Sequence, residues 1–338
     1  MQGGMNGRFI LAGDIGGTHA RLATFQWIDG KLELVRQGSF HTQDYVSLKS
    51  ILALFLDDEQ ERIGAACLGI AGPVIQGRVI APNLHWNVNT GTLKEILKTD
   101  SIWLLNDLEA AGYGIDLLEE QDFLELNRGV PIEGNRVLLS AGTGLGEGLL
   151  VWTGKEHFVS KSEGGHADFA PQNQLEFELY EFLAAEFQHV SWERVLSGPG
   201  ILNLYRFFCA KENAILPDWL SERIAREDPS AAVLNGAIHG KDPICVKTLE
   251  AFIRFLGREA GNLALKAFAT GGVYLGGGIA PSILEQLKSP LFLDEFVFKG
   301  RLSSLLGKIP VRVILRSDVG LLGAARYVSE REKMKWAA

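Results

Sequence analysis

Two glycine-rich turns in this chain combine residue types that can hold phosphate groups. Residues 11–24 place Asp14 near the end of an apolar strand, follow it with two glycines and Thr18, and then begin a second strand. Residues 137–151 contain a related turn at 142–144. Backbone N–H groups freed by glycine turns, with a threonine hydroxyl beside them, can surround phosphate oxygens without an intervening side chain. The pair of turns predicts a nucleotide held between two similar lobes.

Neither turn is a standard nucleotide motif. The Gly-Lys-Ser/Thr ending of a Walker A loop is absent, and neither turn is a Gly-x-Gly-x-x-Gly segment that opens a helix. Each turn alone could be an ordinary hairpin, because glycine serves positive-φ positions in any β protein. Both turns have more glycines than a tight hairpin needs, which implies close approach by a bulky ligand: Gly13, Gly16 and Gly17 in the first, and Gly142, Gly144 and Gly146 in the second.

Asp14 is a candidate magnesium ligand. Its position beside the first turn would let the carboxylate hold Mg²⁺, directly or through water, next to the terminal phosphate. The alternative is a turn-stabilising Asp that accepts hydrogen bonds from nearby amides.

A second carboxylate stands where proton transfer is expected. Asn106 and Asp107 directly follow the apolar strand Ile102–Leu105. In open α/β sheets, ligands gather beyond the carboxyl ends of buried strands. We therefore expect Asp107 to be a general base that takes a proton from an attacking hydroxyl, the role of a positioned Asp in phosphoryl transfer. The alternative is an Asx cap on a helix at Leu108–Tyr113.

A third group of polar residues suits a hydroxyl-rich ligand. Residues 162–169 place Glu163, His166 and an aspartate around two glycines. Sugars need carboxylates that accept from several hydroxyls and an imidazole that donates or accepts once, whereas a zinc site needs more ligands than lie nearby. Glu193 could add another acceptor, although taken singly it is typical of an exposed helix residue.

These residues require a scaffold of strands and helices, and the sequence predicts a similar one twice. Each half begins with three strands that form an antiparallel meander; the first half then alternates helices and strands, and the second is mainly helical. An apolar helical stripe along 249–267 predicts a helix in the core of the larger lobe. The expected strands are 9–14, 20–27, 32–40, 65–70, 102–105, 136–141, 147–152, 157–161, 273–275 and 311–315, and the expected helices include 45–55, 92–98, 108–113, 249–267 and 321–328.

Composition limits the class of protein. The 338 residues are 46% hydrophobic and 22% charged, typical of a soluble globular protein with two domains. A net charge of −8 without a Lys/Arg run argues against nucleic-acid binding. Cys67, Cys209 and Cys245 are too scattered for a disulfide framework or a CxxC metal site. No segment approaches the roughly 20 apolar residues that span a bilayer, and the N-terminus lacks a signal peptide's apolar stretch. We therefore expect a cytoplasmic protein with no nucleic-acid or membrane partner.

In order and extent, these motifs resemble those of bacterial glucokinases of the hexokinase/actin-like ATPase superfamily, specifically the proteobacterial and cyanobacterial type. One departure is His19, where this family usually has Asn after Gly-Gly-Thr. The resemblance covers almost the whole chain and is carried by residues 13–18, 69–74, 106–107, 141–146, 163–171, 193–200 and 276–279.

The resemblance implies a fold, an activity and a set of site residues. The fold is α/β, the two-lobed actin-like ATPase (ribonuclease H-like) fold with a central cleft, and the activity is ATP-dependent phosphorylation of D-glucose at its 6-hydroxyl, with magnesium. Asp107 would be the base, and the sugar contacts would come from Asn106, Asp107, Glu163, His166 and Glu193. The ATP contacts would come from Gly13, Asp14, Ile15, Gly16, Gly17, Thr18, Gly142, Thr143, Gly144, Gly276, Gly277 and Gly278.

The resemblance also implies an organisation and leaves alternatives open. A small α/β domain is expected over 1–116, completed by a C-terminal helix at 317–338, with a large α/β domain over 117–316. Known family members are often homodimers, so a homodimer is expected. The alternatives are a kinase for a related hexose, a non-catalytic sugar-sensing protein of the same fold, and an actin-like or chaperone ATPase without a small-molecule acceptor.

Overall fold

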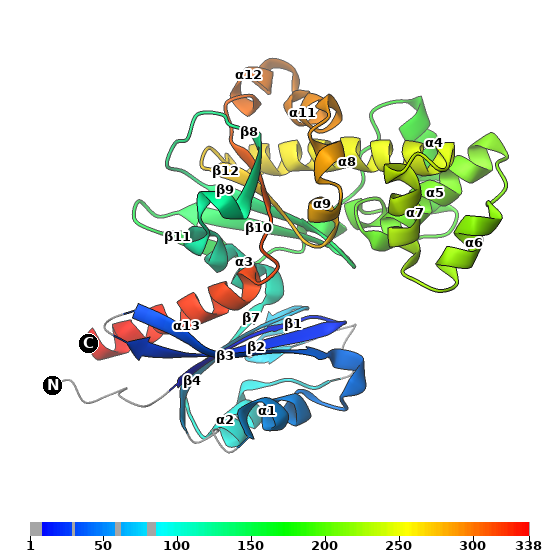
Figure 1. Cartoon of the computed structure of the whole chain (residues 1–338). Helices are drawn as coiled ribbons and strands as arrows, with labels where there is room; N and C mark the ends of the chain where they lie inside the picture. Colours follow the sequence, from blue (N-terminus) through cyan, green and yellow to red (C-terminus); the bar gives the residue numbers. More distant parts are fainter. Residues whose placement is uncertain (1–8, 29–30, 58–61, 80–85, 338) are drawn as a thin grey trace. The chain divides into compact units, whose positions relative to one another are not determined.

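Two compact units form the chain in the computed structural model, which describes residues 9–28, 31–57, 62–79 and 86–337 (Figure 1). Unit 1 is Met1–Glu119 with Arg316–Ala338, and unit 2 is Glu120–Leu315. The boundaries expected from the sequence were 116/117 and 316/317. Residues 1–8 and 338 of the expected small domain lie outside the described residues.

Unit 1 is built on a five-stranded sheet in the order β3-β2-β1-β4-β7. The first three strands pair antiparallel, and β1, β4 and β7 run parallel. The strands are β1 (Phe9–Ile15), β2 (His19–Ile28), β3 (Lys31–His41), β4 (Ile63–Ile70) and β7 (Ile102–Asn106), with a small separate hairpin of β5 (Val74–Ile75) and β6 (Arg78–Val79).

Helices cover both faces of this sheet (Figure 1). On one face α13 (Val319–Ala337) packs against α3 (Asp107–Gly114), β1 and β4, and on the other α1 (Leu48–Leu56) completes the apolar core. Strands buried on both faces are apolar along their whole length, which explains the burial of nearly every residue of β1 and β4. The remaining helices are η1 (Thr42–Asp44), α2 (Thr90–Leu97) and η3 (Ile115–Leu117).

Unit 2 repeats this arrangement with one more strand, in the order β11-β10-β9-β12-β13-β8. Again three strands form an antiparallel meander and two run parallel to its first strand. The sixth strand, β8, pairs antiparallel at the edge and was not predicted. The strands are β8 (Phe123–Asn127), β9 (Arg136–Ala141), β10 (Leu145–Trp152), β11 (His157–Ser160), β12 (Gly272–Gly276) and β13 (Val311–Ile314).

The long helix α8 (Pro243–Ala267) forms the centre of the unit 2 core. It begins six residues before the predicted apolar stripe, because the Asp242 side chain accepts a hydrogen bond from the backbone N–H of Cys245 and Pro243 occupies the first turn. The other helices are η4 (Glu120–Asp122), η5 (Gly164–His166), α4 (Gln174–Ala184), η6 (Trp192–Arg194), α5 (Gly198–Glu212), α6 (Asp218–Ile224), α7 (Pro229–Ile238), α9 (Ile279–Ser282), α10 (Leu284–Leu287), α11 (Pro290–Val297), η7 (Gly300–Leu302) and α12 (Ser303–Leu306).

Within the described part of the chain, every helix is too short or too polar to span a bilayer.

Candidate functional site

The first glycine turn joins β1 to β2 at the edge where the parallel strands of unit 1 end. The N–H of Gly16 donates to the carbonyl of His19 at 2.8 Å and so closes the turn. The hydroxyl of Thr42, on η1, donates to the carbonyl of Gly17 at 2.5 Å. The His19 ring packs edge-on against that of its cross-strand partner His41, with centroids 5.4 Å apart. The turn is therefore fixed from its outer side by protein contacts.

Asp14 lies next to this turn in a charged setting. Its Oδ2 is 3.6 Å from Nη1 of Arg21, which also donates to the carbonyl of Ser317 at 2.5 Å. Burial raises the pKa of Asp14 to about 6; Arg21 opposes the shift, and the nearby Asp107 and Asp318 carboxylates add to it. Asp14 and Asp107 are thus close enough to interact, as expected if both act on one substrate.

Asn106 and Asp107 lie where β7 ends. Asn106, not Asp107, caps the helix that follows: its Oδ1 accepts the N–H of Leu108 at 2.9 Å, and its own N–H donates to Oε2 of Glu109 at 3.4 Å. The expectation that Asp107 might be the cap of a helix starting at Leu108 is therefore wrong. Asp107 is the first residue of α3, and its Oδ1 accepts the N–H of Leu108 at 3.0 Å.

The cap also orients Asn106 itself. Its Nδ2 donates to the carbonyl of Gly72 at 3.1 Å, in the segment after β4. Ile70 and Asn106 are partners in the parallel pairing of β4 and β7, and Asp14 pairs with Gly69. Unit 1 therefore brings Asp14, Asn106 and Asp107 to the same sheet edge.

The second glycine turn joins β9 to β10 in unit 2. The N–H of Gly142 donates to the carbonyl of Gly144 at 2.9 Å, and the N–H of Gly198, at the start of α5, donates to the carbonyl of Gly142 at 2.8 Å. Gly277, after β12, has φ of 81°, and a Cβ there would lie 2.2 Å from the carbonyl oxygen of Ala141. Only glycine fits at 277, so the segment 276–278 passes directly beside the second turn.

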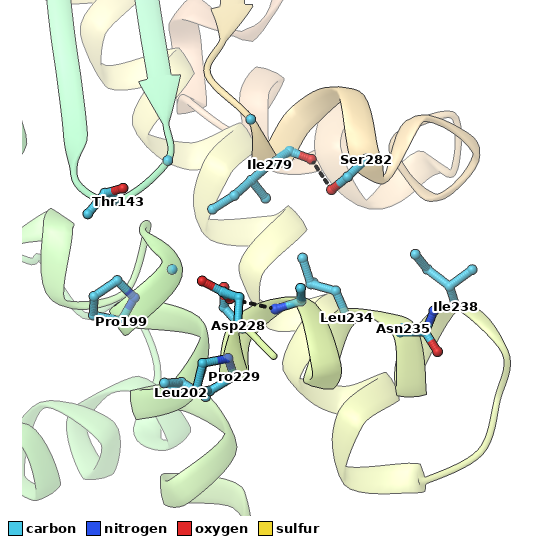
Figure 2. A pocket seen from close by; sticks show the side chains of 15 residues that line it. Thr143, Pro199, Leu202, Asp228, Pro229, Leu234, Asn235, Ile238, Ile279 and Ser282 are labelled. Atoms are coloured by element: carbon cyan, nitrogen blue, oxygen red, sulfur yellow. Dashed lines mark hydrogen bonds between the residues drawn. The ribbon is translucent and has the colours of Figure 1, made fainter. Parts of the chain in front are cut away.

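A cavity of about 680 Å³ opens beside this turn (Figure 2). Of the six residues of unit 2 predicted to contact nucleotide, Gly142, Thr143 and Gly278 line it, and Gly144, Gly276 and Gly277 do not. The rest of the wall comes from α5, α7 and α9, and consists of Gly198, Pro199, Leu202, Asp228, Pro229, Ser230, Ala231, Leu234, Asn235, Ile238, Ile279 and Ser282.

The other polar group of unit 2 converges on Glu193. Its Oε2 accepts the N–H of Leu145 at 2.9 Å, and its Oε1 lies 3.9 Å from Nδ1 of His166. Glu193 is in η6 with a side chain 28% exposed, so its interpretation as an exposed helix residue is wrong. Glu163 and His166 are exposed and flank Gly164 and the buried Gly165 at η5. The segments that carry them are joined by hydrogen bonds such as Trp192 N–H to the carbonyl of Ala167 at 3.0 Å.

Comparison with known proteins now decides the family. The model of the glucokinase family matches residues 11–331 of this chain.

The chain belongs to the glucokinase family.

Its relatives include cyanobacterial and enterobacterial proteins. The chain is 41% identical over 332 residues to a glucokinase of Nostoc punctiforme, covering 94% of this chain and 97% of that one. It is 34% identical over 324 residues to a glucokinase of Salmonella arizonae, covering 96% and 98%. The crystal structure of a glucokinase from an Antarctic psychrotroph matches with a TM-score of 0.82 at 32% identity, covering 95% and 99%. The predicted glucokinase-type enzyme and the predicted two-lobed actin-like ATPase fold are confirmed.

The glycines of this glucokinase-family chain divide into two groups. A Cβ at Gly13 would lie 2.5 Å from Cδ2 of Leu68, and a Cβ at Gly144 would lie 2.6 Å from Oε2 of Glu193, so a larger residue at either position would displace a neighbouring side chain. At three other glycines a Cβ would meet no close atom: the nearest would be 3.5 Å away at Gly16, 4.0 Å away at Gly142 and more than 4 Å away at Gly278. Protein atoms therefore leave room for a side chain at those three positions.

Several cavity residues were missed by sequence reasoning. Leu202, Asn235 and Ser282 lie on helices far apart in the sequence, and nothing in their local patterns distinguishes them from ordinary helix residues. Asp228 carried a usable signal, because Asp-Pro-Ser is typical of a helix start; its Oδ1 accepts the N–H of Ala231 at 2.9 Å (Figure 2).

Proposed function

We propose that this protein transfers the terminal phosphoryl group of ATP to the 6-hydroxyl of D-glucose, with Asp107 as the general base. Membership of the glucokinase family supports the reaction. The observation that carries the role of Asp107 is its position: it follows β7, at the carboxyl end of a parallel strand, close enough to Asp14 to raise the pKa of that carboxyl. A carboxylate there can accept the hydroxyl proton as the new P–O bond forms.

The two glycine turns and the cavity of unit 2 are our proposed ATP site. The segments Gly13–Thr18 and Gly142–Gly144 would lie against the phosphates, with N–H groups at the tips of the turns as donors; those of Gly16 and Gly142 instead close the turns. The segment 276–278 would lie near the adenosine. The cavity of about 680 Å³ is within the range of small-molecule sites. Apolar contacts for the adenine ring could come from Leu202, Leu234 and Ile279, and polar contacts from Asn235 and Ser282.

Asp14 fits the role of a magnesium contact. It is a largely buried carboxylate with the Asp107 carboxylate nearby, and a carboxylate beside a phosphate site can contact a divalent cation bound with ATP, directly or through water. When bound, Mg²⁺ would offset negative charge on the phosphates. Arg21 holds Asp14 in place from the other side.

The proposed glucose contacts come from both units. Asn106 and Asp107 of unit 1, and Glu163, His166 and Glu193 of unit 2, supply the carboxylates, amide and imidazole that several sugar hydroxyls need. We propose the two units as the two lobes of the kinase. The resemblance supports a homodimer, which sedimentation of the purified protein tests, and the sequence pattern supports a cytoplasmic location.

The deciding experiment measures ADP release, with ATP as donor, in the presence and absence of glucose. The proposal expects release that depends on glucose and yields glucose 6-phosphate. Release without sugar would indicate an ATPase, and no release together with measurable glucose binding would indicate a sugar sensor; either result overturns the proposal. A panel of mannose, fructose and glucosamine against ATP, ADP and polyphosphate then separates glucose from related hexoses and ATP from other donors.

A further inference from the structure

Two buried carboxyl groups lie inside unit 2, where α8 packs against β10, and one of them contacts the turn η5 (Gly164–His166). Glu147, on β10, is 2% exposed, and Glu259, on α8, is fully buried. Neither belongs to the site proposed above. Isolated carboxylates are costly to bury, so a buried pair of this kind needs a compensating interaction.

The surroundings compensate Glu259 more fully than Glu147. Oε2 of Glu259 accepts from Nδ2 of Asn262 at 2.8 Å, and its Oε1 lies 3.4 Å from Nζ of Lys266. Within the described part of the chain, the buried Oε1 of Glu147 has no hydrogen-bond partner. The Glu259 carboxyl lies within hydrogen-bonding reach of Glu147, but two carboxylates cannot bond to one another unless one of them carries a proton.

The Glu147 side chain also forms the floor of η5. A Cβ on Gly164 would lie 2.2 Å from Oε2 of Glu147 and 3.0 Å from its Cδ, and a Cβ on Gly165 would lie 2.0 Å from the carbonyl oxygen of Leu145. The turn therefore rests on β10 without any spare space. Any displacement of the Glu147 carboxyl toward the turn would move Gly164, and with it the residues on either side.

We propose that Glu147 and Glu259 share one proton, and that this protonated pair holds η5 in the position from which Glu163 and His166 reach the sugar. Glu147 is thus a positioning residue that acts through Gly164. Loss of the shared proton to solvent would leave two negative charges close together in a buried site, and their repulsion would shift the Glu147 carboxyl and disturb its contact with Gly164. The role toward glucose rests on the proposed function, whereas the sharing of a proton does not.

The charges around the pair are consistent with this assignment. Burial, and then the charge of Glu259, raises the pKa of Glu147 to about 7, against a weaker opposing effect of Lys266. Burial also raises the pKa of Glu259, which Lys266 and Lys299 oppose. The side chain of Lys266 is 57% exposed, Lys299 is itself held at a lowered pKa of about 8 by burial, and Arg258 is occupied by Glu176 and Glu295. The titratable groups at η5 are Glu163, which precedes it, and His166, its last residue.

The test compares the wild type with Glu147→Gln, in which an amide replaces the protonated carboxyl at nearly the same volume. The KM for glucose and the kcat are measured from pH 6 to pH 9 at saturating ATP. The glucose KM of the wild type should rise at least about threefold more than that of the variant as the pair ionises, with little difference in kcat. Glu156→Gln, at an exposed position after β10, is the matched control and should follow the wild type.

Unfolding as a function of pH provides a second measurement that needs no activity. A carboxyl whose folded-state pKa is raised adds stability that is present at low pH and is lost as the pH rises through that pKa. The free energy of unfolding of the wild type should therefore fall relative to Glu147→Gln between pH 5 and pH 8. Equal pH dependence of unfolding in the two proteins would overturn the shared proton.

The outcomes separate this inference from the proposed function. If the wild type shows no glucose-dependent ADP release, the proposed function fails, and the positioning role fails with it, while the unfolding comparison still decides whether a proton is shared. If ADP release depends on glucose but the KM profiles of wild type and Glu147→Gln are parallel, the positioning role fails and the proposed function stands.

Discussion

The two units use the same strand order for different purposes. In each, a three-stranded meander is followed by two strands parallel to its first member, and the first hairpin of the meander is a glycine turn. When β1 is matched to β9 by the ends of their pairing, Ile15 corresponds to Ala141 and Asp14 to Ser140. The first turn thus carries a carboxylate with an arginine across from it, and the second carries a hydroxyl with Gly146 across from it.

The difference extends to the ends of the parallel strands. In unit 1 the last strand, β7, ends at Asn106 and is followed directly by Asp107, whereas in unit 2 the corresponding strand, β13, is followed by Leu315. Unit 2 instead has a cavity walled by helices behind its turn. We infer that the shared topology supplies a glycine turn twice, and that a carboxylate on the strand leading into the turn is present in unit 1 alone. Unit 1 would then bind the reacting groups, and unit 2 would bind the rest of the nucleotide.

The largest loss of activity should come from replacing Asp107, the carboxylate after the last parallel strand of unit 1. Asp107→Ala should lower kcat by at least about 10²-fold, the usual loss for a general base, with a much smaller change in the KM for glucose. Asp107→Asn keeps an oxygen that can accept from the N–H of Leu108, so a residue needed only for helix geometry would be rescued by Asn. Steady-state kinetics with glucose and ATP distinguish the two roles.

The matched control for Asp107 is Asp100→Ala, in the same unit. Its side chain is 98% exposed and pairs with Lys94 at 3.2 Å, and such surface pairs contribute little. Near-normal turnover in both Asp107 variants would remove this residue from the reaction.

The sequence predicted the strands around the two glycine turns better than it predicted the edge strand and the helix cap. Local periodicity and turn residues sufficed for the strands that meet at the glycine turns, since those signals lie within a few residues of each other. β8 was missed because its pairing depends on β13, nearly 190 residues later, and its five residues are only partly buried. Asn106 and Asp107 were predicted as a pair, but the sequence did not show which of them caps α3. Two hydrogen bonds show that it is Asn106: its Oδ1 accepts from the N–H of Leu108, and its own N–H donates to Glu109.

The cavity of unit 2 could not be predicted from the sequence. Its wall is assembled from α5, α7 and α9, whose facing residues share no sequence pattern. The same holds for the contact of Glu193 with the second turn, which joins residues 48 positions apart. Residue types suggested the chemistry, but the packing of the helices decides which side chains meet.

A smaller effect should follow from making the first turn like the second. Asp14→Ser places at 14 the residue type that stands at the corresponding position, Ser140, and removes the carboxylate proposed to contact magnesium. We expect kcat to fall by about 10-fold to 100-fold, with a higher magnesium requirement. Ser140→Ala, in the second turn, should change both by less than about threefold if charge is needed in unit 1 alone. Activity measured over a series of magnesium concentrations tests this.

Equal losses in Asp14→Ser and Ser140→Ala would contradict the division of roles. Thermal unfolding serves as the control for folding: Asp14→Ser removes a carboxyl whose pKa is raised by burial, so the variant should be no less stable than the wild type near neutral pH.

The smallest expected change in activity comes from replacing one glycine in each turn, which tests whether both turns contact the phosphates. Gly16→Ala and Gly142→Ala should both fold normally, because the nearest atoms to the new Cβ are 3.5 Å and 4.0 Å away. Each methyl group would stand where phosphate oxygens approach the backbone and would weaken a charge-assisted hydrogen bond, so the KM for ATP should rise about tenfold in each variant. Gly307→Ala, with 3.6 Å of space and far along the chain from either turn, is the control. A rise in only one turn variant would mean that the other turn closes a hairpin and nothing more, and that the two halves of the molecule share a topology without sharing a ligand.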